Sequence, residues 1–338
     1  MKINKEKLQP CLRAARSAID PKAQVELYRS VCFRNGYLFA FNGELGVGVH
    51  TGLPLSCCIP ADRIMRVVDS IPADADIVFE QHGSLVRVVS GSFRVTLQTQ
   101  AADPFPDILP KALLPLPKLD KLASEMKQVL FSAGDKDLGG LGISGNHVYS
   151  TDGNRATRVR LSGTAVPEKI RISSRTAKVF ASFGEPTNWF YNNGSLLAMY
   201  QDMFVVARET AHKFPFGAID QQIDRFGSPT ILELPKGTAA AVSRVFSLTG
   251  SSTEKRRGII LAADGSQLHI RLAVSEIGDA EESIVWACPK PFEIRMSVDF
   301  LSEALAITRK VDFSRVLEGK MHLRFVNGSF EHVVCLMV

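Results

Sequence analysis

The chain has 338 residues, of which 45% are hydrophobic and 22% are charged, and it carries 40 Lys and Arg against 35 Asp and Glu. This balance is typical of a globular chain of two or three domains, and it excludes a disordered, collagenous or coiled-coil protein. The formal net charge of +5 permits a polyanionic partner without identifying one.

The N-terminal segment and the cysteines indicate the cellular compartment. Charged residues recur every few positions up to Arg16, so no signal peptide is predicted, and no run of about 18 apolar residues predicts a membrane span. We therefore expect a cytoplasmic protein with no membrane partner. The six cysteines are scattered without a CxxC pair, which favours reduced, mostly buried thiols over a metal site. Neither a metal nor a cofactor is predicted.

In chain order, the same succession of strands, tight turns and helices recurs with a period of roughly 110 residues, the size of a whole domain. The period predicts three similar domains over residues 1–110, 111–224 and 225–338. Each repeat carries two tight turns between β-rich flanks, where Gly or Asn supplies the positive φ that a hairpin requires. These turns are Asn35-Gly36, His82-Gly83, Gly145-Asn146, Asn193-Gly194, Asp264-Gly265 and Asn327-Gly328.

Each repeat also predicts two helices, from apolar residues at helical spacing. The predicted ranges are 5–17, 61–71, 118–129, 174–183, 236–246 and 299–311. Asp62 is the expected cap of the second helix. Proline-rich residues 106–117 and residues 223–235 are predicted linkers. Alternating strands with short turns favour antiparallel sheets, so the fold class is α+β with the helices on one face.

No catalytic motif is present. The glycines of Gly140-Leu141-Gly142-Ile143-Ser144-Gly145 match GxGxxG, but they lead into a predicted strand, whereas a dinucleotide fingerprint opens a helix. Asp152 is better interpreted as a turn residue that bonds its own backbone than as a catalytic carboxylate. No P-loop, GxSxG or HExxH occurs. We predict no catalytic residue, and an enzyme with a dispersed site is the remaining alternative.

Basic residues outnumber acidic ones on the predicted helices. Ordinary exposed helix faces would carry such residues too. If the helices line one channel, however, the same side chains form a diffuse positive lining that contacts phosphates without reading base sequence. The residues that we expect to face DNA are Lys7, Arg13, Arg16, Lys121, Lys127, Arg175, Lys178, Arg244, Arg309 and Lys310.

Several short motifs occur in a distinctive order along essentially the whole chain. They are Met1-Lys2-Ile3 before a helix, Ile59-Pro60-Ala61, Phe93-Arg94-Val95-Thr96-Leu97 before Phe105-Pro106-Asp107, Ser150-Thr151-Asp152-Gly153-Asn154-Arg155-Ala156, Lys213-Phe214-Pro215, Lys255-Arg256-Arg257-Gly258-Ile259 and Val333-Val334. In this order they resemble the bacterial replicative sliding clamp, the β subunit of DNA polymerase III. The fourth motif is the most specific, and it looks like the Ala-Thr-Asp-Gly-His-Arg-Leu of that family.

The resemblance implies the DNA clamp fold, with three domains per chain, and a ring-shaped homodimer that encircles double-stranded DNA with helices lining the hole. It also implies a non-enzymatic processivity factor that tethers DNA polymerase and the clamp loader through short linear peptides. By the resemblance, the peptide pocket would consist of Leu138, Thr151, Gly153, Asn154, Arg155, Ala156, Pro215, Val333 and Met337.

The chain departs from the family pattern at several of these positions. Asn154 stands where the family has His, Ala156 where it has Leu, and the tail lacks the usual Met-Pro-Met-Arg-Leu ending. These departures leave the bound peptide motif open and fit a divergent phage- or plasmid-type member. The alternative function is that of a clamp-like protein that binds or sequesters replication partners without supporting processive synthesis.

Overall fold

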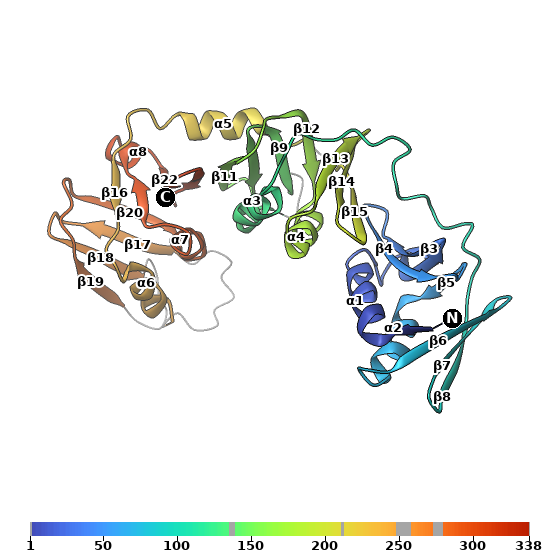
Figure 1. The fold of residues 1–338 in the computed structure, drawn as a ribbon. Helices are drawn as coiled ribbons and strands as arrows, with labels where there is room; N and C mark the ends of the chain where they lie inside the picture. The colour runs from blue at the N-terminus through green and yellow to red at the C-terminus, as the bar shows by residue number, and fades with distance from the viewer. Residues whose placement is uncertain (1, 135–138, 211–212, 248–257, 273–279, 338) are drawn as a thin grey trace. The chain divides into compact units, whose positions relative to one another are not determined.

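A computed structural model describes residues 2–134, 139–210, 213–247, 258–272 and 280–337 (Figure 1). The chain divides into two compact units, Met1–Ser124 with Arg175–Ala211 and Glu125–Ser174 with His212–Val338. Every strand pairing in the described residues is antiparallel, which confirms the α+β prediction. The border between the units runs through the middle repeat, so the boundaries near residues 110 and 224 stay a prediction.

The first unit contains two sheets. The four-stranded sheet has the order β1 (Lys2–Asn4), β6 (Asp76–His82), β7 (Leu85–Ser90) and β8 (Phe93–Gln98). The seven-stranded sheet has the order β13 (Asn188–Asn192), β14 (Ser195–Met199), β15 (Met203–Arg208), β4 (Leu45–Leu53), β3 (Gly36–Phe41), β2 (Ser30–Arg34) and β5 (Cys57–Pro60). In the larger sheet, β15 pairs with β4, and this pairing joins strands of the first and second repeats.

The helices of the first unit are α1 (Lys5–Arg16), α2 (Ala61–Ser70) and α4 (Ser174–Phe183), with the short 3-10 helix η1 at Glu26–Arg29. Asn4 caps the N-terminus of helix α1, because its side chain accepts a hydrogen bond from the amide of Glu6, and the helix buries Leu8 and Leu12. Lys5 is buried, and its ammonium donates to the carbonyls of Asp69 and Ile71 at the end of α2. This lysine therefore stabilises a helix C-terminus.

The second unit also contains two sheets. The eight-stranded sheet has the order β12 (Val166–Ile172), β9 (Leu141–Gly145), β10 (His147–Thr151), β11 (Arg155–Arg160), β23 (Phe330–Cys335), β22 (His322–Asn327), β21 (Lys310–Asp312) and β16 (Ile231–Glu233). The four-stranded sheet has the order β19 (Glu281–Val285), β18 (Gln267–Leu272), β17 (Gly258–Ala263) and β20 (Phe292–Ser297). The pairing of β11 with β23 joins strands of the second and third repeats.

The helices of the second unit are α5 (Phe216–Asp224), α6 (Thr238–Ser247), α7 (Val298–Leu305) and α8 (Ser314–Leu317), and η2 (Leu130–Ser132) follows α3 (Leu122–Val129), which begins at the end of the first unit. Two cores lie beside the larger sheets. One contains Phe41, Phe105 and Phe204, and the other contains Tyr149, Phe216 and Val333. Phe105 and Phe214 of the two Phe-Pro motifs belong to or pack against these cores.

The six predicted hairpins are confirmed, because a strand ends and another begins at each turn. Asn35 and Asn193 have positive φ of 54° and 45°, followed by Gly36 and Gly194 at 78° and 73°. The helix at 174–183 is predicted to the residue. The helix predicted over 299–311 is wrong at its end, because α7 stops at Leu305 and 310–312 form β21.

Two further helix predictions are wrong in detail. Helix α3 begins at Leu122 instead of 118, and the predicted cap Asp62 makes an ion pair with Arg66 within α2, whose N-cap is Pro60 without a side-chain bond. Helices α5 and α8 were not predicted.

Candidate functional site

The Thr151–Ala156 turn is built by its own side chains. The carboxylate of Asp152 accepts hydrogen bonds from the amides of Asn154 (2.9 Å) and Arg155 (3.1 Å), and the hydroxyl of Thr151 accepts one from the amide of Gly153 (3.1 Å). These contacts confirm the interpretation of Asp152 as a turn residue. The turn presents Gly153 as exposed, whereas Thr151 is buried.

Arg155 links β11 to α7. Its guanidinium lies 4.2 Å from the ring centre of Phe300 and 5.4 Å from that of Phe131, and it makes ion pairs with Asp152 (2.9 Å) and Glu303. One nitrogen also donates to the carbonyl of Phe131 at 2.6 Å. The side chain is 9% exposed. Its hydrogen-bonding groups therefore serve first to hold the turn, the helix and η2 together.

Ala156 and Val333 lie opposite each other on β11 and β23, and α5 covers both of them. Phe216 of α5 packs edge-on against Tyr149 of β10, with ring centres 5.5 Å apart. Ala156 is 9% exposed and Val333 3%. The small side chain of Ala156 leaves room for α5 to lie close to the sheet.

A mostly buried arginine side chain holds α5 in place. Arg158 of β11 makes ion pairs with Asp220 (2.9 Å) and Asp224 (3.0 Å) of α5 and with Glu331 (2.7 Å) of β23. Burial opposes the charge of Arg158, but the three carboxylates outweigh it and raise the pKa of the guanidinium above its ordinary value.

His332 lies on the opposite face of the same sheet, fully buried. Its Nδ1 is 2.8 Å from the hydroxyl of Thr157, while its Nε2 has no hydrogen-bond partner among the residues described. Burial, with a smaller contribution from Arg155, lowers the pKa of the imidazole to about 3. The histidine is therefore neutral at physiological pH.

The C-terminal tail extends from the turn to a separate cavity. The amide of Cys335 donates to the carbonyl of Asn154 (2.9 Å), and the amide of Met337 donates to that of Arg295 (2.8 Å). Met337 and Leu336 line a cavity of about 380 Å³ together with Ile260. Asn154 contacts the start of the tail and Met337 lines the cavity at its end, whereas Val333 is buried under α5. Pro215 lines a different cavity, and Leu138 lies outside the described residues.

Most of the predicted DNA-facing residues are exposed. On α1, Lys7, Arg13 and Arg16 are exposed beside the buried Leu8 and Leu12. Arg175 of α4 donates to the carbonyl of Ile19, 3.2 Å away, which places the start of α4 beside the residues that follow α1. The exposed positions outside α1 are Lys121, Lys127, Arg175, Lys178, Arg244 and Lys310.

Two of the ten cations are committed to ion pairs. Arg244 pairs with Glu282 at 2.5 Å, and half-buried Arg309 pairs with Glu233 at 2.5 Å and also donates to the carbonyl of Leu234. Their positive charge is therefore partly neutralised. Within the described ranges no cluster of His, Cys, Asp or Glu suits a metal ion, and no helix has both the length and the apolarity to cross a membrane.

A second group of candidate functional residues, which was not predicted from the sequence, lies on β12. Lys169 and Arg171 alternate with the buried Ile170 and Ile172, so the strand has one apolar and one basic face. That alternation was readable from the sequence, but its position beside Phe214 was not.

No protein-family profile matches the chain, and no curated protein matches it by sequence. Solved structures match it over its full length. The sliding clamp (DNA polymerase III subunit beta) of Pseudomonas aeruginosa bound to griselimycin has a TM-score of 0.84 at 19% identity, covering 100% of this chain and 99% of that one.

Two further structures agree. The Bartonella birtlesii sliding clamp bound to griselimycin gives a TM-score of 0.85 at 16% identity, covering 100% of this chain and 99% of its own. The Caulobacter crescentus polymerase III β subunit gives 0.83 at 16% identity, with coverage of 100% and 99%. The chain therefore has the fold of the bacterial DNA sliding clamps.

Proposed function

We propose that the protein is a DNA sliding clamp, a cytoplasmic, non-enzymatic processivity factor that encircles duplex DNA as a homodimer and tethers a polymerase and a clamp loader. The observation that carries the proposal is the full-length match to the clamp fold, combined with a repeated mode of strand pairing across the repeats.

The strand pairing indicates how a ring could close. In the first unit β15 pairs with β4, and in the second β23 pairs with β11. Strands β4, β11 and β19 occupy equivalent positions, because each ends a run of three consecutive strands: β2–β3–β4, β9–β10–β11 and β17–β18–β19. In the same way, β8 ends the run β6–β7–β8 and β15 ends the run β13–β14–β15. By this analogy β8 should pair with β19. Both strands end their sheets, so β8 of one copy can pair with β19 of a second, and two such contacts close a ring.

The side chains at these edges suit an interface. Phe93 of β8 is 40% exposed and Val285 of β19 is 84% exposed. Arg94 lies beside Phe93, and Glu281 begins β19. Apolar contact and opposite charge at two free edges favour pairing between copies.

The exposed cations of α1, α3 and α4 support weak, sequence-independent contact with phosphates. Such contacts give an affinity that falls steeply with salt. Topological linkage would then be needed to retain the protein on DNA at physiological ionic strength.

The ring is tested by replacing Phe93 with Asp and measuring mass in solution and retention on circular and linearised DNA. We expect the unaltered protein to be a dimer that remains on circular DNA and leaves linear DNA, and Phe93→Asp to be a monomer retained on neither. Leu85→Asp is the matched control, since Leu85 is also 40% exposed but lies on β7, which already has a partner on each side. A monomeric unaltered protein that leaves both DNAs at the same rate refutes the proposal.

The peptide pocket is proposed to include the turn at Asn154, Val333 and the cavity at Met337. Griselimycin, the ligand of two of the similar clamps, is a convenient probe. Met337→Ala should weaken its binding, whereas Met65→Ala, a half-buried methionine of α2, should not. Equal affinity for both variants would contradict the pocket assignment.

Primer extension distinguishes the clamp from the alternative of a clamp-like sequestering protein. A clamp loaded on primed circular DNA lengthens the products of each polymerase binding event. If a loader is present and the protein binds polymerase peptides but only inhibits primer extension, it has the alternative function.

A further inference from the structure

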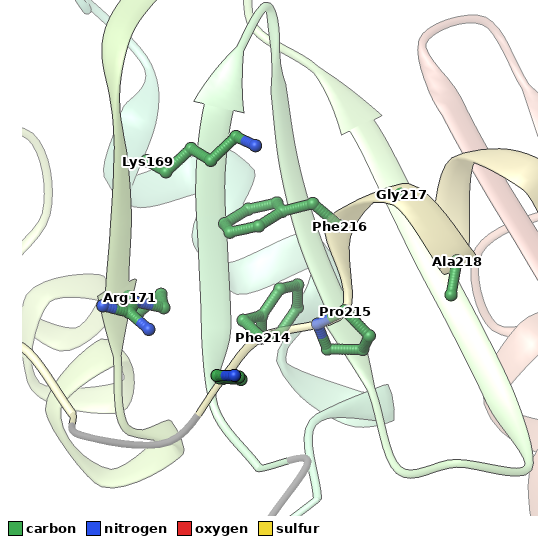
Figure 2. A pocket seen from close by; sticks show the side chains of 8 residues that line it. Lys169, Arg171, Phe214, Pro215, Phe216, Gly217 and Ala218 are labelled. Carbon is green, nitrogen blue, oxygen red and sulfur yellow. The ribbon is translucent and has the colours of Figure 1, made fainter.

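A second cavity, of about 440 Å³, opens beside β12 at the free end of the eight-stranded sheet (Figure 2). Lys169 and Arg171 of β12 line one side, and Lys213, Phe214 and Phe216 line the other. This cavity lies over β12 and β9, whereas the proposed partner pocket lies over β11 and β23 and along the tail. Among the described residues of the predicted partner pocket, Pro215 alone lines it.

The floor of the cavity explains the middle glycine, Gly142, of the GxGxxG match. A Cβ added at Gly142 would lie 2.4 Å from Cε1 of Phe216 and 2.6 Å from Cδ1 of Phe214. Only a glycine at this position therefore lets both rings approach β9 so closely. The two ring centres are 4.8 Å apart with planes inclined by 57°. The sequence thus provides a fixed aromatic floor at this point.

The cavity combines an apolar floor with positive charge. The ammonium of Lys169 lies 5.9 Å from the ring centre of Phe216, and Lys169 and Lys213 are both exposed. None of the described residues that line the cavity is acidic. A complementary ligand therefore carries negative charge beside an apolar group.

The edge of β12 supplies a third feature. In the residues described, β12 pairs with β9 alone, at Val166 and again from Ile170 to Ile172, with an irregularity between. Ile170 and Ile172 are buried toward the core, so Lys169 and Arg171 lie on the cavity side. An edge strand with one free side can accept an added strand from another chain, which main-chain hydrogen bonds would hold.

We propose that the β12 edge and its cavity bind an extended acidic peptide of a partner protein. The peptide backbone adds to β12 as a further strand. An apolar side chain enters the cavity against Phe214 and Phe216, and carboxylates on either side of it face Lys169 and Lys213. The inference does not depend on ring formation or on the partner pocket at the tail.

The probe is a fluorescein-labelled peptide Thr-Asp-Thr-Phe-Thr-Asp-Thr, in which alternation places both Asp and the Phe on one face. Its binding to the full chain is followed by fluorescence anisotropy. We expect saturable binding that the double substitution Lys169→Gln with Lys213→Gln weakens at least tenfold, equivalent to ~1.4 kcal/mol. Lys290→Gln, at an exposed lysine of the same unit, should leave binding unchanged.

Three comparisons complete the test. A peptide with Lys in place of each Asp should not bind, and N-methylation of alternate amides should abolish binding for one set of amides only. An eight-nucleotide oligothymidylate is the third probe, because cations beside aromatic rings also suit single-stranded DNA. Absence of peptide binding, equal affinity in the double variant, or tighter binding of the oligonucleotide through the same lysines overturns the proposal.

Discussion

Arg158→Met should loosen α5 without unfolding the sheet beneath it. Removing one partner of a buried ion pair costs about 3–5 kcal/mol, because the remaining charge is left unpaired. The side chains of Asp220 and Asp224 are 38% and 63% exposed, so solvent screens them, whereas Glu331 is 25% exposed. We therefore expect the lower end, about 3 kcal/mol, concentrated in the docking of α5.

Hydrogen exchange measures this effect locally. A loss of about 3 kcal/mol in local opening free energy corresponds to roughly 150-fold faster exchange for the α5 amides. Helix α7 of the same unit should keep its protection. Arg315→Met is the control, since among the described residues Arg315 makes an ion pair only with the largely exposed Glu318, at 3.1 Å, and it should change little. Unchanged exchange in α5, or equal acceleration in α5 and α7, would refute the reasoning.

Three other predictions test the site. Gly142→Ala should destabilise the protein by about 1–3 kcal/mol, because its Cβ displaces the ring of Phe216, and thermal unfolding should show the loss. His332 is neutral when folded, with its pKa lowered to about 3, so its contribution to stability is complete above pH 6.5 and declines as the pH falls toward 3. Between pH 7 and 5, wild type should lose about 2 kcal/mol more than His332→Phe in urea titrations, and parallel curves would contradict this. Arg155→Ala should cost about 3 kcal/mol, since it unpairs a mostly buried charge network, whereas Glu303→Gln should cost under about 1 kcal/mol; equal unfolding midpoints would argue against a structural role for this arginine.

Local signals predicted the hairpins well. Asn35-Gly36 and Asn193-Gly194 adopt the positive φ values that their sequence demands, and the strands follow directly. Helix α3 shows where local reasoning fails. The amides of Ala123 and Ser124 are capped by the carboxylate of Glu185, which is about sixty positions away, so nothing near 118 could indicate where the helix begins.

The site was predictable as a set of residues but not as an arrangement. The end of α7 was misplaced because Ile307 continues the apolar pattern, whereas the hydroxyl of Thr308 bonds the carbonyl of Val326 and directs the chain into β21. Helix α5 was missed although its buried Phe216, Ile219 and Ile223 recur at helical spacing. The sheet residues that these side chains cover, and Arg158, lie far away in sequence. Neither the ion pairs of Arg155 nor the burial of Ala156 under α5 can be read from the neighbouring sequence.

The pairing of β15 with β4 and of β11 with β23 limits which truncated fragments of the protein can fold. A fragment that spans only the middle repeat would expose two edge strands, β11 and β15, whose backbone amides and carbonyls have lost their partners. It should therefore aggregate when expressed alone. Proteolytic fragments that remain soluble should keep the strand of the first or third repeat that pairs with each of these edges.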